Sequence, residues 1–182
     1  MTPTPTPHVR IVQLDTATLA ALADGDLARA RATSPVALTG WLAGPDCVST
    51  WRFRALQAVE TPEDLPWVTG VLWDEDEQRP VGKAGFHAAP DPDGMVEVGY
   101  AVDPADRRRG YARAALEVMI ARARAHPAVR TLRATVSPDN AASLGLIGQY
   151  PFVENGEQWD EEDGLEIIFE LEVGPERLSV AR

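Results

Sequence analysis

The residues best suited to chemistry lie in one short run, Arg107-Arg-Arg-Gly-Tyr-Ala112, which has the spacing R-x-x-G-x-A. A strand-like apolar segment, Met95–Val102, precedes this run, and from Ala112 on the apolar residues recur at a helical period. The run therefore joins a strand to the first turn of a helix, where amides lack a partner within the helix and the helix dipole is positive. Gly110 keeps the backbone open to a ligand, and the arginines add positive charge. These features predict a site for an anion with several oxygens, such as a pyrophosphate; the alternative is a surface turn with solvated arginines.

Two further stretches add polar side chains. On the strand before the turn, alternation places Glu97, Gly99 and Ala101 on one face. A carboxylate beside such small residues is typical of the border of a cavity, although a structural ion pair with a neighbouring arginine is the alternative. Further along the chain, Asn140 and Ser143 are three residues apart and share one face of a predicted helix.

Hydrophobic periodicity indicates the elements that position these residues. Strands are predicted at residues 9–14, 67–73, 81–87, 95–102, 131–136 and 165–173, with one more from Phe152. Helices are predicted from Asp15 to Ala30, at residues 51–60, after Gly110, and after Ser137, which is a good N-cap before Pro138. Strands 95–102 and 131–136 should run parallel, because a helix connects them.

The fold class expected from this order is α/β. We expect a single domain at residues 9–174, with a mixed, mostly antiparallel sheet of six to seven strands flanked by helices. Threonine and proline alternate in residues 2–7, so residues 1–8 are expected to form a disordered tail, and residues 175–182 a C-terminal tail.

The order of strand, anion turn, helix, strand and N-x-x-S helix resembles the GNAT acetyltransferase superfamily. The resemblance runs from about Val81 to Val173, and more loosely from Val9. The matching pieces are Glu97-Val-Gly-Tyr100, Val102-Asp-Pro, Arg107-Arg-Arg-Gly-Tyr-Ala112 and Asn140-Ala-Ala-Ser143. The chain looks most like the branch that includes the ribosomal-protein N-terminal acetyltransferases, the RimJ/RimL-like enzymes.

The resemblance implies an acetyl-CoA-dependent enzyme and a role for each matching residue. Contacts with acetyl-CoA are implied for Tyr100, Ala101, Val102, Arg107, Arg108, Arg109, Gly110, Tyr111, Ala112, Arg113, Asn140 and Ser143. The backbone of residues 100–102 would pair with the pantetheine arm and donate an N–H to the thioester oxygen. Glu97 would be the general base, because an amine protonated near neutral pH must lose a proton before it attacks a thioester.

Some of these roles have alternatives. Asn140 could bond only its own backbone at the start of its helix. His87 could replace Glu97 as the base, although a single histidine more often fills space. Many family members carry a tyrosine as general acid for the leaving thiolate where this chain has Ile147, and Tyr150 follows three residues later. Water could protonate the thiolate instead, because thiol pKa values are only about 8.5.

Aromatic residues Trp41, Trp51 and Phe53 lie in the region that covers the acceptor site in the resembled family. They could line a substrate pocket, but packing in the core is the favoured interpretation, because aromatic side chains are mostly buried for packing.

Composition narrows the class of protein. The net charge of −11 argues against general binding to nucleic acid and fits attraction of cationic amines. The sequence has no run of eighteen apolar residues and no secretory signal at its start, and it has a single cysteine, Cys47. The three histidines lack metal-ligand spacing, so no metal is expected. We therefore expect a cytoplasmic protein without a membrane segment.

The function predicted is transfer of an acetyl group from acetyl-CoA to an amine, either a small molecule or a protein N-terminus, by direct attack in a ternary complex. One alternative is a non-catalytic module that binds or senses acyl-CoA. Another is an interaction protein that uses the acidic segment at residues 154–172. The identity of the amine and the oligomeric state cannot be read from the sequence.

Overall fold

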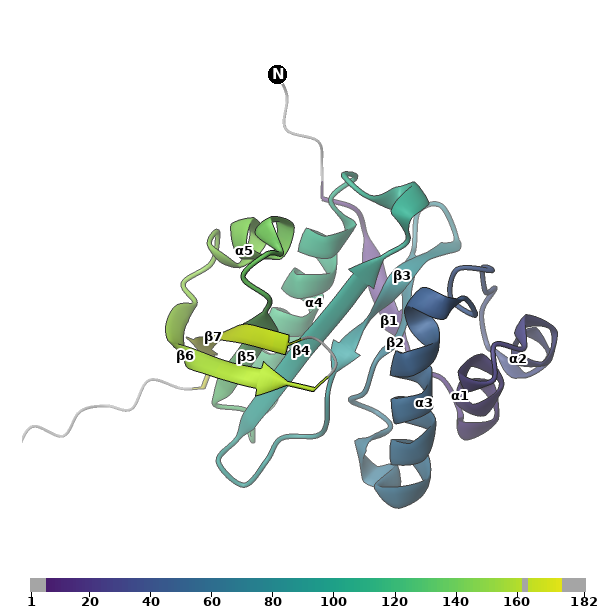
Figure 1. Ribbon diagram of the computed structural model, residues 1–182, viewed down its shortest axis with the longest axis horizontal. Coiled ribbons are helices and arrows are strands. Elements are labelled where there is room, and N and C mark those ends of the chain that lie inside the picture. The colour runs from purple at the N-terminus through teal and green to yellow at the C-terminus, as the bar shows by residue number, and fades with distance from the viewer. Residues whose placement is uncertain (1–5, 162–163, 175–182) are drawn as a thin grey trace, which may run out of the picture. The chain divides into compact units, whose positions relative to one another are not determined.

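Within residues 6–161 and 164–174, which the computed structural model describes, seven strands form a sheet in the order β1-β2-β3-β4-β5-β7-β6 (Figure 1). The strands are β1 (Val9–Val12), β2 (Gly70–Asp74), β3 (Arg79–Phe86), β4 (Met95–Val102), β5 (Thr131–Val136), β6 (Val153–Asp160) and β7 (Gly164–Glu172). The pairs β1–β2, β2–β3, β5–β7 and β6–β7 are antiparallel, and β4 and β5 are parallel. The predicted α/β class with a mixed, mostly antiparallel sheet is confirmed, and so is the parallel pair.

The helices are α1 (Thr16–Ala23), α2 (Leu27–Thr33), α3 (Pro45–Glu60), α4 (Tyr111–Ala125) and α5 (Ala141–Ile147), with short 3-10 turns η1 (Pro62–Asp64) and η2 (Pro104–Asp106). Among the described residues, none of these helices is both long and apolar enough to cross a membrane. The chain divides into two units, Met1–Ala89 with Gly99–Met119, and Pro90–Val98 with Ile120–Arg182. Strand β4 and helix α4 each contribute to both units.

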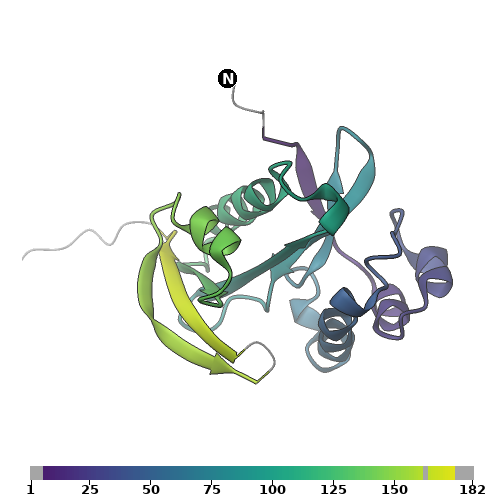
Figure 2. The same ribbon diagram turned by 45° about the horizontal axis from the view of Figure 1, so that its top comes forward.

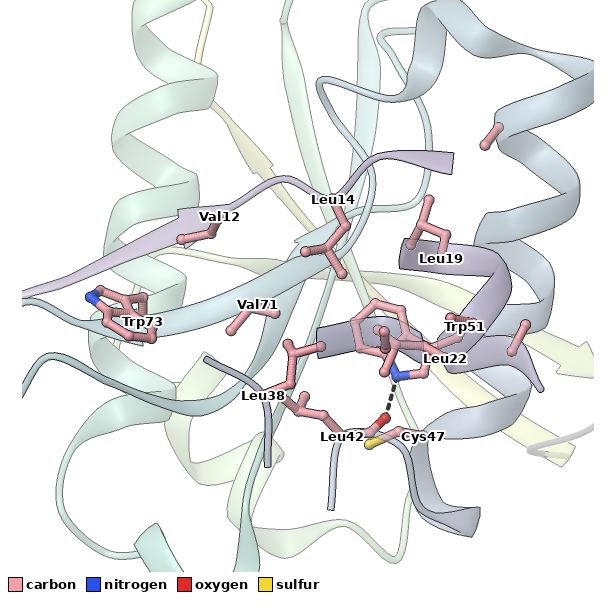
Figure 3. Packing of buried hydrophobic residues seen from close by; sticks show 14 residues of the cluster. Val12, Leu14, Leu19, Leu22, Leu38, Leu42, Cys47, Trp51, Val71 and Trp73 are labelled. Atoms are coloured by element: carbon pink, nitrogen blue, oxygen red, sulfur yellow. Dashed lines mark hydrogen bonds between the residues drawn. The ribbon is translucent and has the colours of Figure 1, made fainter. Parts of the chain in front are cut away.

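The first unit contains an apolar cluster that its N-terminal helices close (Figure 3). Helix α1 packs against α2 and α3, and the three helices lie side by side in Figure 2. Leu22 from α1, Trp51 from α3 and Val71 from β2 are fully buried in this cluster. Burial of a large apolar side chain stabilises the fold by about 1.5–3 kcal/mol. The indole N–H of Trp51 donates to the Leu42 carbonyl oxygen at 2.6 Å, so burial leaves this polar group satisfied.

The second unit is built on β5, which pairs with β7 from Thr131–Glu172 to Val136–Ile167. Strands β6 and β7 form a hairpin, which is prominent in Figure 2. Along β5 the side chains alternate between one buried face and one half-buried, polar face. The buried side chains are Leu132, Ala134 and Val136, and the polar ones are Thr131, Arg133 and Thr135. Thr135 on this polar face contacts Glu97 of β4, the candidate base.

The helix predicted from Asp15 to Ala30 is two helices, so that prediction is wrong. Asp15 caps α1 as predicted, and its side chain accepts the Thr18 N–H at 2.8 Å. The chain then turns at Gly25, whose φ of 71° suits glycine, and the Asp26 side chain caps α2. The alanines and leucines on both sides continue a helical composition, which hides this break in the sequence.

Two other helix starts also differ from prediction. Helix α3 begins at Pro45 rather than at residue 51, because proline is favoured in the first helical turn. Helix α5 is capped by Asn140 and not by Ser137. The Ser137 carbonyl instead accepts the Asn140 N–H at 2.9 Å, which makes a turn ahead of the helix.

The strand predictions are closest for β4 and β5, which begin and end as predicted. The strand expected from residue 67 begins at Gly70, and Val68 makes only an isolated bridge with Phe86. Residues 1–5 and 175–182 of the two predicted tails lie outside the described residues, as do residues 162–163 in the acidic segment.

Candidate active site

Strand β4 leads directly into the turn that was predicted to bind an anion. Asp103 caps η2, because its side chain accepts the Ala105 N–H at 3.0 Å. Arg107 Nε then donates to the Val102 carbonyl oxygen at 3.3 Å, so the arginine run begins close to the end of the strand. These local bonds bring the chain from the strand to the helix in eight residues.

The turn has an uncommon backbone conformation. Arg108 has φ 64° and Gly110 has φ 88°. The left-handed region costs a residue with a side chain about 1–2 kcal/mol, so the surrounding structure must hold Arg108 in place. The first hydrogen bond of α4 runs from the Ala114 N–H to the Gly110 carbonyl oxygen at 3.0 Å. The amides of residues 111–113 therefore precede the hydrogen-bond ladder of the helix.

This arrangement suits an anion. The amides ahead of the ladder and the helix dipole place partial positive charge at the turn. Arg107 and Arg108 are exposed and add formal positive charge beside it. The predicted strand-to-helix setting of the motif is thus present, and its residues fit a pyrophosphate.

Arg109 lies in the same run but is part of an ion-pair network. Asp106 is buried and accepts hydrogen bonds from Arg79 Nη1 at 2.7 Å and Nη2 at 2.6 Å, and from Arg109 Nη1 at 2.9 Å. Both arginines also pair with Glu77, at 2.6 Å from Arg79 and 2.5 Å from Arg109. The hydrogen bonds from Arg79 hold the pKa of Asp106 below its usual range and raise that of Arg79. The Arg109 guanidinium therefore anchors the turn to the residues around the β2–β3 hairpin, which leaves its backbone amide as the group to face a ligand.

Tyr111 is a second anchor of the same turn. Its side chain is buried, and its hydroxyl donates to Asp74 Oδ2 at 2.5 Å. Burial, together with this bond to a carboxylate, raises the pKa of Tyr111 to about 12. Burial would raise the pKa of Asp74, but the bonds from Tyr111 and from the Glu77 and Asp76 amides hold it below the ordinary value. The first residue of α4 is thus fixed to the end of β2.

Glu97 has the place on β4 that alternation predicts. Val96 and Val98 are buried, whereas Glu97 is half-buried on the opposite face. Glu97 Oε1 accepts a hydrogen bond from Thr135 Oγ1 on β5 at 2.8 Å. The neighbouring Arg133 on β5 pairs with another carboxylate, as described below.

His87 lies just beyond β3 and is held by its backbone. Its carbonyl oxygen accepts hydrogen bonds from Arg54 Nη1 and from Gln57 Nε2, both at 2.9 Å. A Cβ atom added at Gly99 would lie 2.9 Å from His87 Nε2. The imidazole of His87 therefore lies against Gly99, and a side chain at position 99 would displace it.

Asn140 and Ser143 are adjacent in the second unit, and their contact is local. Asn140 Oδ1 accepts the Ser143 N–H at 3.1 Å as the N-cap of α5. The alternative role of Asn140, bonding at its own helix start, is therefore present. This cap uses the side-chain oxygen and leaves the NH₂ group as the part that can donate to a ligand. Ile147 is buried in the place of the family tyrosine, so this position supplies no acid.

The aromatic residues divide between core and surface. Trp51 is in the core, as favoured from the sequence, and Trp41 packs against the same cluster. Phe53 is 59% exposed, so its predicted core position is wrong. It lies two residues from Trp51 on α3 and hence on the other side of the helix.

The predicted residues fall into two groups. The first unit brings together residues 100–102 and 107–113, with His87 close to Gly99. The second unit holds Glu97, Asn140 and Ser143. No group of three or more potential metal ligands occurs in the part of the chain that the structure describes.

Sequence reasoning missed the residues that support the site. They are Arg79, Asp106, Asp74 and Thr135. Each of them has one partner that lies 27 to 38 positions away, and no local pattern indicates these distant contacts.

The family model described as "Acetyltransferase (GNAT) domain" matches residues 10–152. The chain therefore belongs to the GNAT acetyltransferase family, as the resemblance of its motifs predicted. An uncharacterized N-acetyltransferase of Bacillus subtilis, YjdG, is 31% identical over 85 residues, which are 47% of this chain and 51% of that protein. The chain thus spans about half the length of this curated relative.

Solved structures share the fold across nearly the whole chain. The ribosomal-protein-S5-alanine acetyltransferase of Vibrio fischeri is similar with a TM-score of 0.59 and 19% identity, over 93% of this chain and 95% of that one. A ribosomal L7/L12 α-N-protein acetyltransferase in complex with coenzyme A has a TM-score of 0.62 and 13% identity, over 94% and 97%. Such identities show the fold alone, and ribosomal-protein acetyltransferases, the branch named from the motifs, are among the proteins that have it.

Proposed function

We propose that this protein is an acetyl-CoA-dependent N-acetyltransferase of the cytoplasm, which transfers the acetyl group to an amine of a small molecule or a protein N-terminus. The observation that carries the proposal is the turn between β4 and α4. Its amides precede the helical ladder, Arg108 and Gly110 hold left-handed conformations, and two exposed arginines flank it. Membership of the GNAT family supports the same reaction.

In the proposed site, several segments of the chain contact acetyl-CoA. The amides of residues 108–113 bind the pyrophosphate, and Arg107 and Arg108 add attraction for the phosphates. The backbone of residues 100–102 lies beyond the β4–β5 pairs, which run from Met95–Thr131 to Glu97–Arg133, and is proposed to pair with the pantetheine arm. The NH₂ group of Asn140 and the side chain of Ser143 are further candidates for contact with the arm.

Acetyl-CoA supplies the acetyl group as a thioester. The amine nitrogen forms a bond to the carbonyl carbon, the carbon–sulfur bond breaks, and the electron pair of that bond leaves with the thiolate. A backbone N–H at residues 100–102 donates to the carbonyl oxygen while negative charge develops there. Glu97 takes the proton that the amine loses, directly or through one water. The products are an acetamide and coenzyme A.

The thiolate needs no protein acid in this account. Ile147 is apolar and buried, so it cannot donate a proton. A thiolate is an acceptable leaving group near neutral pH, because thiol pKa values are about 8.5, and water can protonate it.

A non-catalytic module that binds or senses acyl-CoA is the second candidate, because the tyrosine acid of many relatives is missing. Free thiol release from acetyl-CoA, measured with a panel of amines, separates the two. Thiol release that depends on the amine, with an acetylated product of the expected mass, supports the enzyme. Tight binding without turnover on any amine supports the module, and no binding of acetyl-CoA contradicts both.

A further inference from the structure

The neighbours of Glu97 on the polar face of the second unit are placed by strand register. In the parallel ladder, Glu97 on β4 is the register partner of Arg133 on β5. Adjacent strands lie about 4.8 Å apart, and opposite charges at such positions attract. An ion pair between these two side chains would therefore be the expected arrangement.

Arg133 instead directs its guanidinium to the next strand. Its Nε and Nη2 donate to Glu170 Oε1 on β7 at 3.0 and 2.7 Å. Arg133 and Glu170 are register partners in the antiparallel β5–β7 ladder, so this pair also forms across neighbouring strands. Asn155 Nδ2 on β6 donates to the other oxygen, Glu170 Oε2, at 2.6 Å. Both oxygens of the Glu170 carboxylate are thus engaged, and its position is fixed from two strands.

Glu97 receives a neutral donor from the same strand. Thr135 Oγ1 donates to Glu97 Oε1 at 2.8 Å, two residues beyond Arg133. A hydroxyl fixes the orientation of a carboxylate with less stabilisation of its charge than a guanidinium gives. A base that must accept a proton is served by orientation but weakened by a full ion pair.

We propose that Thr135 orients Glu97 for proton transfer and that Glu170 holds Arg133 away from Glu97. Thr135 and Glu170 are thus positioning residues, which act through the candidate base. The inference rests on the proposed function, since it requires Glu97 to take the proton of the amine.

The first test neutralises charged side chains on β5 and β7. In Glu170→Gln, Arg133 loses its carboxylate partner and becomes available to Glu97. The variant should lose at least about tenfold in kcat, because a charge-assisted bond then stabilises the unprotonated base. The double variant Arg133→Gln with Glu170→Gln removes the competing cation and should recover to within about threefold of wild type, since Arg133 then no longer competes with Thr135 for the base. Full activity of Glu170→Gln, or a double variant as slow as the single one, would overturn the role of Glu170.

Glu166→Gln is the matched control for Glu170→Gln. Glu166 lies on the same strand and face as Glu170, four residues away, and accepts from Gln158 Nε2 at 2.9 Å rather than from an arginine. It should keep the kcat of the wild-type protein. A loss in this control as large as that in Glu170→Gln would mean that any neutralised carboxylate on β7 slows the reaction, and the proposal would fall.

The second test concerns Thr135. Thr135→Val keeps the shape and removes the donor, and loss of a bond to a charged group predicts about a tenfold lower kcat. Thr135→Ser keeps the hydroxyl and should restore the rate. In a Glu97→Gln background, Thr135→Val should not lower kcat further, because its effect acts through Glu97. Equal losses in both backgrounds, or no loss in the single variant, would refute the orienting role.

Two readouts separate a positioning effect from damage to the fold. Melting temperature and coenzyme A affinity, measured by calorimetry, should match wild type in all variants. The kinetics use an amine that the wild-type protein demonstrably acetylates. If no such amine exists, the proposed function itself fails. If wild type is active but Thr135→Val and Glu170→Gln are as fast, only this inference fails.

Discussion

Replacement of Asp106 by asparagine should destabilise the protein and weaken its hold on acetyl-CoA together. The Asp106 side chain is only 8% exposed and accepts three hydrogen bonds from two guanidinium groups. Asparagine keeps the shape but removes the charge, so the arginines lose a buried partner. Removal of one member of a buried ion pair costs about 3–5 kcal/mol.

The expected loss of stability in Asp106→Asn is smaller than this range, because the two arginines remain partly in water and keep Glu77 as a partner. Their side chains are 34% and 45% exposed. We therefore expect a loss of about 2 kcal/mol in the free energy of unfolding. For a domain of this size, a loss of that order lowers the melting temperature by roughly 4–8 °C. Coenzyme A affinity should fall as well, because the amides of the turn lose their fixed position.

The pH dependence gives this prediction a second readout. The pKa of Asp106 is lowered by the hydrogen bonds from Arg79, so its stabilising contribution is complete above the ordinary aspartate value of 3.8. The contribution disappears as the pH falls below that value, because the folded protein must then take up a proton. The gap in melting temperature between wild type and Asp106→Asn should therefore close in acid.

Thermal unfolding and calorimetry with coenzyme A, each measured at pH 7 and in acid, test these expectations. Glu77→Gln is the control, because Glu77 belongs to the same network but is exposed and should change the melting temperature little. If Asp106→Asn has the same melting temperature as wild type at pH 7, or binds coenzyme A equally well, the anchoring role of the network is refuted.

Three further predictions concern the turn and the helix that follows it. Gly110→Ala should weaken coenzyme A binding in calorimetry, because Gly110 has φ 88° and an added Cβ atom would lie 3.1 Å from Pro7 Cδ. Gly145 has open space around it, so the control variant Gly145→Ala should bind coenzyme A as the wild-type protein does. Neutralising Arg107 and Arg108 together should flatten the decline of coenzyme A affinity with rising salt, since exposed charges are screened over about 8–10 Å at ordinary ionic strength; equal slopes in variant and wild type would mean that these arginines only solvate the surface. Tyr111→Phe should remove the loss of stability that the wild-type protein shows between pH 10 and 12, as measured by circular dichroism. The pKa of Tyr111 is raised from 10.0 to about 12 in the folded protein, so the stability that this group contributes is lost as the pH rises through that window.

The sequence predicted well those features that rest on local pattern. Strands β4 and β5 match their predicted bounds, because one face of each alternates with buried valines, leucine and alanine. The position of the turn between β4 and α4 is also predicted correctly, since its glycine and the start of the helix are neighbours in the chain. The place of Glu97 on the face opposite Val96 and Val98 follows from the same alternation.

Features that depend on distant partners could not be predicted. Arg109 and Tyr111 look like ligands of a phosphate in the sequence, yet their side chains bond Asp106, Glu77 and Asp74. Two of these acids lie 32 and 37 positions away, so only the folded chain shows the contacts.

The break between α1 and α2 was missed for a different reason. The two aspartates around Gly25 are each compatible with a helix, and only the positive φ at the glycine ends it. Serine before proline is a common helix start and predicts the cap of α5 at Ser137, but a turn delays the helix to Asn140.

The most direct test of the account compares Glu97→Gln with wild type on an amine that wild type acetylates, with coenzyme A affinity measured in the same preparations. Glutamine keeps the shape of the side chain and removes the base. We predict that the rate of amine-dependent thiol release falls by about 10²–10⁴, the usual contribution of general-base catalysis, while affinity for coenzyme A is unchanged. A variant that turns over within a few-fold of wild type would contradict the role of Glu97, and His87 would become the candidate base.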